Sequence, residues 1–175
     1  MKDPVGRWQT GGFLFTAVVG TGLHFLFDLT GGNVLAALIS AVNESIWEHL
    51  KLLFYPMLIF SLFQYRKWGR DRYDFWCVKL RGTLLGLILI PVLYYSYTGI
   101  LGVKADWFNI TIFFLVAGFV YLWETRQFKK GISCPRPDLA IAGFVVITLL
   151  FTLLTFLPPQ IPLFRDPLTG TYGFQ

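Results

Sequence analysis

Residues 139–157 read LAIAGFVVITLLFTLLTFL, a stretch without a charged side chain, and this stretch decides the fold class. An α-helix needs about 20 apolar residues to cross the hydrocarbon core of a bilayer, which is about 30 Å thick. The stretch has this length, and Pro158 and Pro159 follow it directly, where a helix is expected to stop. It therefore predicts a membrane-spanning helix.

Four further apolar runs predict four more membrane-spanning helices. They cover residues 12–31, 44–65, 82–101 and 107–122, and the helix of the 82–101 run could begin as early as Phe75. Residues 34–42 are also apolar but too few to cross a bilayer, so they predict a short half-helix at the outer surface. The expected fold is all-α: a single transmembrane domain over residues 1–175, with five transmembrane helices plus one short outer half-helix.

The composition of the whole chain agrees with a membrane protein. Of the 175 residues, 55% are hydrophobic and 14% are charged, whereas soluble domains carry about 25% charged residues. The formal net charge is +5, but the basic residues lie between the apolar runs and not on one soluble face. This distribution argues against nucleic acid as a partner and makes the lipid bilayer the expected environment.

The basic residues also predict the orientation of the chain in the membrane. They concentrate at residues 2–7, 66–81 and 126–136, which would all lie on one side of a five-helix bundle. Because the cytoplasmic side carries the excess of Lys and Arg, we expect a cytoplasmic N-terminus and an extracytoplasmic tail at residues 158–175. The expected protein is thus a multi-pass protein of the plasma membrane.

Cys77 and Cys134 are the two cysteines of the chain, and they form no C-x-x-C motif. On the expected orientation both lie on the cytoplasmic side, where thiols are kept reduced. We therefore expect two free thiols and neither a disulfide nor a metal-binding pair.

Ionisable residues concentrate in the outer halves of the first two predicted spans. Such residues cost at least about 2.5–3.5 kcal/mol each inside a bilayer, so they are retained where they are paired, hydrated or functional. His24 and Asp28 are four residues apart and would share one face of the first helix. The two spans are joined by a short outer segment, so this face is expected to meet the second helix.

The second helix would contribute the larger share of the polar cluster. If it begins at residue 44, with Asn43 as its N-cap, then Glu44, Glu48 and Lys51 share one face at about 100° per residue. His49 follows Glu48 directly and would lie about 100° around the helix from it.

The favoured interpretation of this cluster is a metal site in a membrane-embedded, hydrolase-like protein. Imidazole and carboxylate groups are ligands that zinc accepts, and neighbouring helices of a bundle can supply them in pairs. Catalytic roles would fall to Glu44 as general base and to Lys51, which would tune the charge of the site. The cofactor would be a divalent ion, zinc above others, and the substrate a small or lipid-linked molecule. The expected metal ligands are His24, Asp28, Glu48 and His49.

Two other interpretations remain open for the same residues. The carboxylates could bind protons or a cation in a small coupled transporter or channel, since such groups form proton relays inside membranes. Alternatively, Glu48 with Lys51 and His24 with Asp28 could be charge-paired core residues of a structural or partner-binding membrane protein. Self-association into a homo-oligomer through helix faces that carry Gly82, Gly86 or Gly118 is a further option.

The tail at residues 160–175 contains Pro162, Pro167, Gly170 and Gly173, which predict an extended and turned segment rather than a helix. Apolar residues alternate with these turn residues, which is unusual for a disordered terminus. We expect an ordered tail, either a lid over the outer end with Arg165 facing the acidic cluster or a strap at the membrane surface.

The segment NESIWEHLK at residues 43–51, followed by LLFYP at residues 52–56, is distinctive. Together with the tail around residues 162–173, it resembles an uncharacterised family of small bacterial integral membrane proteins, the domain of unknown function 6512. The resemblance covers essentially the whole chain and implies a protein of the bacterial inner membrane. It supplies no activity, so no catalytic residue is transferred from it.

Overall fold

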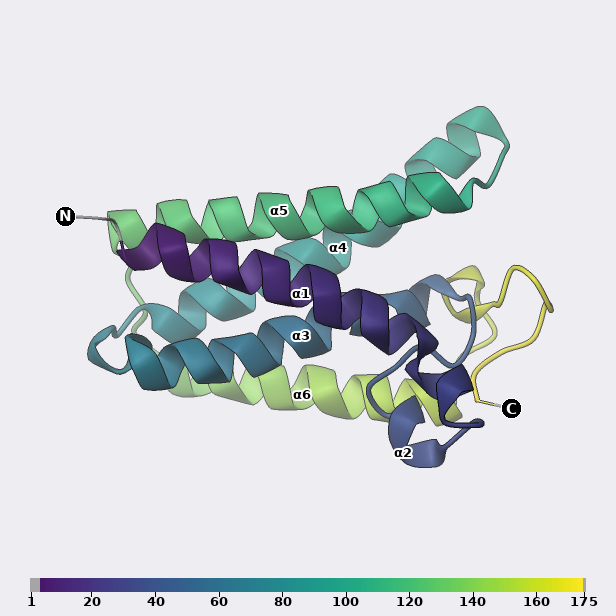
Figure 1. Ribbon diagram of the computed structural model, residues 1–175, viewed down its shortest axis with the longest axis horizontal. Coiled ribbons are helices and arrows are strands. Elements are labelled where there is room, and N and C mark those ends of the chain that lie inside the picture. Colours follow the sequence, from purple (N-terminus) through teal and green to yellow (C-terminus); the bar gives the residue numbers. More distant parts are fainter. Residues whose placement is uncertain (1–3, 175) are drawn as a thin grey trace.

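The computed structural model describes residues 4–174, and helices are its regular secondary structure, without a strand in that range. Five of the six α-helices are long and apolar enough to cross a membrane, which confirms the all-α, five-span prediction. A four-residue helix and two 3-10 turns complete the fold (Figure 1). The elements are α1 (Pro4–Leu29), α2 (Val34–Ala37), α3 (Ile46–Lys67), η1 (Gly69–Asp71), α4 (Phe75–Leu101), α5 (Asp106–Lys130), α6 (Pro137–Phe156) and η2 (Pro162–Phe164).

Helix α3 is the central helix of the bundle. In an apolar stretch of 18 residues of α3, 61% of the residues are buried inside the protein, whereas the corresponding share is 22–33% in the other four long helices. Helices α1, α4 and α6 all pack against α3, and α5 closes the bundle against α1 and α4. Polar side chains on α3 are therefore shielded from lipid by the helices around them. The start of α1 and the described end of the tail lie at opposite ends of the bundle, as an odd number of spans requires (Figure 1).

The helices extend beyond the apolar runs that predicted them. Helix α1 begins at Pro4 rather than at residue 12, and α5 continues to Lys130 rather than stopping at residue 122. Apolar residues mark the part of a helix inside the membrane, whereas the helix itself continues through polar residues until a stop signal. For α5 that signal is Gly131, whose φ of 68° is left-handed and favours glycine. Helix α4 begins at Phe75, the early start considered from the sequence.

The connection between α1 and α3 differs from its prediction in two details. The half-helix expected at residues 34–42 is the four-residue α2, capped by Asn33, whose side chain accepts a hydrogen bond from the Leu35 amide. The N-cap of α3 is Ser45 and not Asn43. Asn43 instead accepts from the Ser45 amide and donates to the Gly173 carbonyl, so its side chain ties this connection to the tail.

Two of the glycines expected to form a self-association face are buried inside the bundle. A Cβ at Gly82 would lie 2.5 Å from Glu124 Oε1, and one at Gly86 would lie 2.6 Å from Leu53. Both positions therefore let helices of the same chain approach closely. They are not available to a second copy, which corrects this part of the sequence interpretation.

The expectation of two free thiols is wrong, because Cys77 and Cys134 form a disulfide. Cys77 lies in the first turn of α4 and Cys134 in the α5–α6 connection, with Cα atoms 5.9 Å apart. This separation is within the range that a disulfide can bridge. The prediction relied on the redox state of the expected compartment, and it could not include the proximity that folding imposes.

Loss of this cross-link is expected to destabilise the fold. The disulfide joins residues 57 positions apart, and a cross-link of this kind contributes about 2–4 kcal/mol to the free energy of unfolding. The Cys77→Ala/Cys134→Ala variant and the reduced wild type should both unfold at lower temperature in detergent, followed by circular dichroism. Intact mass after alkylation reports the fraction of protein that is cross-linked. Equal unfolding temperatures for the oxidised and the reduced wild type would contradict the prediction.

The tail folds back over the end of the bundle that also holds α2, and we call this the outer end after the orientation that the basic residues predict. The Phe164 side chain is buried and stacks on Trp47 of α3 with ring centroids 4.7 Å apart. The Phe174 amide donates to the Thr155 carbonyl at the end of α6. Apart from η2, the tail is extended and turned as expected, with a single bridge between Arg165 and Tyr172.

Candidate functional site

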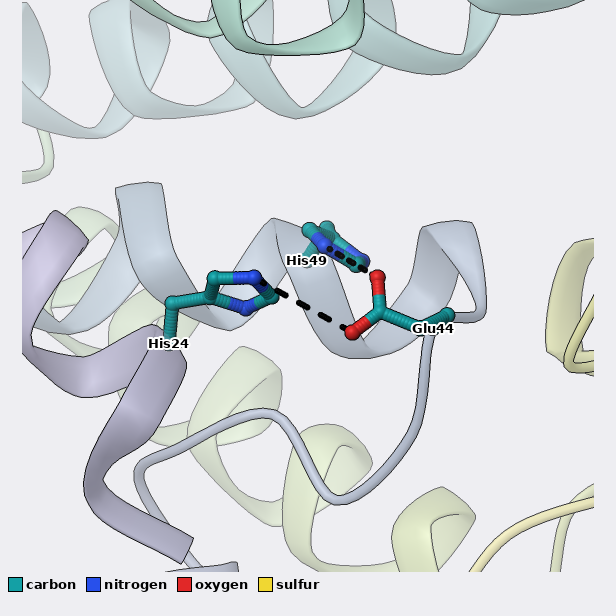
Figure 2. Close-up of side chains that lie close together, drawn as sticks. All are labelled: His24, Glu44 and His49. Carbon is teal, nitrogen blue, oxygen red and sulfur yellow. Dashed lines mark ion pairs between the residues drawn. The ribbon is translucent and has the colours of Figure 1, made fainter. Parts of the chain in front are cut away.

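Three side chains from separate elements converge at the outer end of the bundle: His24 of α1, Glu44 of the α2–α3 connection and His49 of α3 (Figure 2). The Glu44 carboxylate lies between the two imidazoles, with His49 Nε2 3.4 Å from one oxygen and His24 Nε2 3.9 Å from the other. One donor atom from each residue lies within 4.8 Å of the other two. We refer to these three residues as the His–Glu–His group.

The start of α3 positions two members of this group. Ser45 has extended backbone angles (φ −69°, ψ 151°), so the helix begins only after it and the Glu44 side chain points toward His24 and His49. His49 Nδ1 lies 2.9 Å from the Ser45 carbonyl. A proton on Nδ1 would be donated to this carbonyl and would leave the Nε2 lone pair directed at Glu44, which is how proteins orient histidine ligands of metals.

The His–Glu–His group is accessible from outside the bundle. The side chains of His24, Glu44 and His49 are 32%, 42% and 31% exposed. His24 Nδ1 is buried and has no hydrogen-bond partner in the described chain. An ion at this position could therefore keep water among its ligands, as catalytic but not structural zinc sites do.

Glu48 and Lys51 form a separate, buried network one turn below. Their carboxylate and ammonium groups are 2.5 Å apart, and both side chains are almost fully buried. Glu48 also accepts hydrogen bonds from the Val42 amide and from Thr155 Oγ1. Lys51 donates to the Ala37 carbonyl and to Thr155 Oγ1. Because both carboxylate oxygens of Glu48 are occupied, the structure places this residue in a closed ion pair and outside the His–Glu–His group.

Asp28 also lies outside the His–Glu–His group. It is exposed on the last turn of α1, one turn beyond His24. Of the four metal ligands predicted from the sequence, the structure thus brings His24 and His49 together. The carboxylate beside them is Glu44, which the sequence analysis assigned to general-base catalysis.

A second buried polar network, at the opposite end of the bundle, was missed by the sequence analysis. Lys79 of α4 and Glu124 of α5 form an ion pair of 2.7 Å and are both fully buried. Gln9 of α1 donates to the same Glu124 oxygen and accepts from Lys79, and Gln64 of α3 donates to Gln9. The sequence analysis counted Lys79 among the basic residues between two spans, at residues 66–81, and it assigned no role to Glu124. The signal that could have identified them is the length of the helices. Helix α4 begins before Lys79 and helix α5 ends after Glu124, so both residues lie inside helices that pack against each other.

The fold and the site together define the class of protein. It is a multi-pass α-helical membrane protein with a His–Glu–His group open at one end and a buried ion pair near each end. The chain belongs to the Family of unknown function (DUF6512), whose model matches residues 2–174. No curated protein and no solved structure matches it.

Proposed function

We propose that this protein is a membrane-embedded metal-binding protein of hydrolase-like type, holding one divalent cation, best zinc, between His24, Glu44 and His49. The observation that carries the proposal is the convergence of these three donors from three separate elements. Two imidazoles and one carboxylate with an open fourth position are the ligand set of many catalytic zinc sites.

The separations of the donor atoms are compatible with such an ion. Ligands about 2.0–2.2 Å from a tetrahedral zinc ion are about 3.4 Å apart from one another. His49 Nε2 and the nearer Glu44 oxygen already have this separation, and His24 Nε2 is 3.9 Å from the carboxylate. The two distances reach different oxygens of Glu44, and one donor atom from each residue lies within 4.8 Å of the other two, so the three side chains would draw closer together around the ion.

The pairing of Lys51 removes an electrostatic objection to the metal. A free ammonium group near the site would repel a cation, and the sequence suggested that Lys51 shares a face with Glu44. Instead, Glu48 neutralises Lys51 in a buried ion pair, and the ammonium points toward Thr155 and the Ala37 carbonyl. The carboxylate of Glu44 is therefore the nearest charge available to an ion held by the two histidines.

A bound zinc ion would activate water or polarise a carbonyl or phosphoryl oxygen. The chain itself would contribute orientation, since the Ser45 carbonyl fixes the His49 ring and the α2–α3 connection places Glu44. Glu44 also lines a polar pocket of about 540 Å³ on the outer surface. A substrate in that pocket would lie beside the ion.

Metal content of the purified protein tests this proposal. Wild-type protein, purified in detergent without chelator and analysed by mass spectrometry, is expected to carry about one zinc per chain. Replacing a ligand removes a bond to the metal, so His49→Ala and Glu44→Gln should each weaken zinc binding by at least about a hundredfold. Titration of apo-protein with zinc gives the dissociation constants.

Asp28→Asn is the matched control for these variants. Asp28 is an acidic residue one turn from His24 but exposed and outside the His–Glu–His group, so its replacement should leave zinc affinity unchanged within about twofold. Absence of zinc from the wild type, or retention of zinc by His49→Ala, would reject the proposed site.

A proton- or cation-coupled carrier is the second candidate function. It is supported by the two buried ion pairs, Glu48–Lys51 and Lys79–Glu124, because ionisable groups inside membrane helices commonly form relays for protons or ions. Proton flux into liposomes containing the protein tests this candidate. Flux that is lost in Glu48→Gln, from protein that binds no zinc, would favour the carrier over the metal site.

A further inference from the structure

The polar pocket beside the His–Glu–His group is built by elements that are distant in the sequence. The last turns of α4 and the α4–α5 connection supply one part of its lining, the tail supplies another, and Glu44 also lines it. In Figure 1 the α4–α5 hairpin projects away from the remaining helices at this end, and the tail lies beside α6. The pocket therefore lies between the α4–α5 hairpin and the tail.

Two cationic side chains in this pocket have no carboxylate partner within the described residues. Lys104 comes from the α4–α5 connection and Arg165 from the tail, and both are exposed. The nearby Asp166 is buried, and its carboxylate accepts hydrogen bonds from the Leu168 amide and Thr169 Oγ1 within the same turn. The partly exposed carboxylate of the lining is Glu44, which lies beside His24 and His49. Lys104 and Arg165 are therefore the two positions at which the pocket can neutralise an anionic group.

An apolar groove of about 370 Å³ lies directly below the polar pocket. It runs between α4 and α6 over the start of α3, and its lining atoms are almost entirely apolar. The side chains of Ile88, Val92 and Leu150 line it and also remain 59%, 51% and 42% exposed. In a membrane these exposed faces contact lipid chains, so the groove is open to the bilayer.

The groove lies beyond a point at which α4 and α6 approach closely. Toward the disulfide end, a Cβ at Gly143 of α6 would lie 2.8 Å from the Leu80 side chain of α4. Toward the outer end, α4 contains Pro91, which lines the groove and removes a backbone hydrogen bond from the helix. The space between the two helices is filled by neither of them.

The pocket and the groove are lined by neighbouring residues of three elements. Pro91 and Val92 line the groove, and Tyr94 and Tyr95 line the pocket one turn further along α4. The same adjacency holds for Trp47 and Ile46 of α3 and for Leu163 and Pro162 of the tail. Polarity thus changes once along this path, from charged at the outer surface to apolar inside the membrane, as it does along a lipid molecule.

We propose that the pocket and groove together bind one anionic phospholipid of the outer leaflet, with its phosphate at Lys104 and Arg165 and an acyl chain between α4 and α6. The headgroup then lies beside Glu44 of the His–Glu–His group. The role of this lipid as the substrate of the His–Glu–His group rests on the proposed metal function, whereas binding of the lipid requires no metal.

Binding of dioleoyl phosphatidic acid tests the proposal, measured by native mass spectrometry on the full-length protein in mild detergent. Dioleoyl phosphatidylcholine has the same chains without net charge, and glycerol 3-phosphate has the phosphate without chains. We expect one phosphatidic acid per chain, bound at least about tenfold more tightly than either comparison ligand because both the charge and the chain contribute. Equal binding of phosphatidylcholine, or equally tight binding of glycerol 3-phosphate, would overturn the proposal.

Two pairs of variants separate the proposed site from general lipid adhesion. Lys104→Gln/Arg165→Gln should weaken phosphatidic acid binding about tenfold or more, whereas Arg70→Gln/Lys130→Gln, which removes two basic residues at the opposite end, should not. Leu150→Trp fills the groove and should weaken binding, whereas Leu149→Trp places the same side chain on an exposed position outside the lining. Circular dichroism of each variant verifies folding. Equal loss in a variant and its control would reject the site.

Measurements with added zinc and with chelator distinguish this proposal from the preceding one. If the wild type binds phosphatidic acid through Lys104 and Arg165 but binds no zinc, the lipid site stands and the metal function fails. If zinc binds through His49 but the charge and groove variants retain full lipid affinity, the metal site stands and the lipid site fails.

Discussion

Lys51→Met is expected to lower the free energy of unfolding by about 3–5 kcal/mol, because it leaves the buried Glu48 carboxylate without its counter-charge. The Lys51 side chain is fully buried, so water cannot replace the ammonium group. The methionine side chain is similar in length and fills the space, which isolates the loss of charge from the loss of packing. Titration with a denaturing detergent measures the effect.

The Glu48→Gln/Lys51→Met variant distinguishes a charge effect from a packing effect. Replacing both members of a buried ion pair by neutral groups is often close to neutral, so the double variant should recover most of the stability lost by Lys51→Met alone. Arg66→Met is the matched control, since Arg66 is an exposed basic residue of the same helix and its loss should change stability by less than about 0.5 kcal/mol. A double variant as unstable as Lys51→Met would contradict the explanation by charge.

The membrane fold could be predicted from the sequence because it depends on a coarse property. A run such as residues 139–157 has one favourable environment, whatever its exact side chains, and α6 occupies residues 137–156. The ends of the helices were less predictable, since α1 and α5 continue through polar residues such as Gln9 and Glu124, which lie outside the apolar runs. The sequence therefore predicts the number of spans better than the residues at which each helix begins and ends.

The site could be predicted only in part, because one residue lies outside the helix that was expected to carry it. The helical spacing of Glu44 and Glu48 places both on one face only if the helix begins at residue 44. It begins at Ile46, after the extended backbone of Ser45. Glu44 therefore points toward His24 and His49, while Glu48 remains on the buried face with Lys51.

The second buried polar network, around Lys79 and Glu124, could not be found from spacing within one helix. Lys79 and Glu124 are 45 residues apart in the sequence and belong to different helices, so no periodicity connects them. Their burial follows from the close approach of α4 and α5 at Gly82, where a Cβ would lie 2.5 Å from Glu124 Oε1. Only the packing of the two helices removes these charges from water.

Lys79→Met is expected to destabilise the protein by a similar amount, about 3–5 kcal/mol, because Glu124 is fully buried and loses the cationic partner that it has among residues 4–174. Gln9 would still donate to Glu124, but a neutral amide cannot replace the ammonium charge. The measurement is again the free energy of unfolding in detergent. Arg81→Met, two positions along α4 and exposed, is the control and should have little effect.

The Lys79→Met/Glu124→Gln variant then tests whether the second buried polar network stabilises the fold or carries protons. As a structural pair it can be neutralised, so the double variant should fold and leave the zinc binding that we propose for the His–Glu–His group unchanged, because that group lies at the opposite end of the bundle. In a carrier the same variant would fold but lose proton flux, since the relay would lack its ionisable groups. Retained zinc binding together with unchanged flux would assign the network to stability alone.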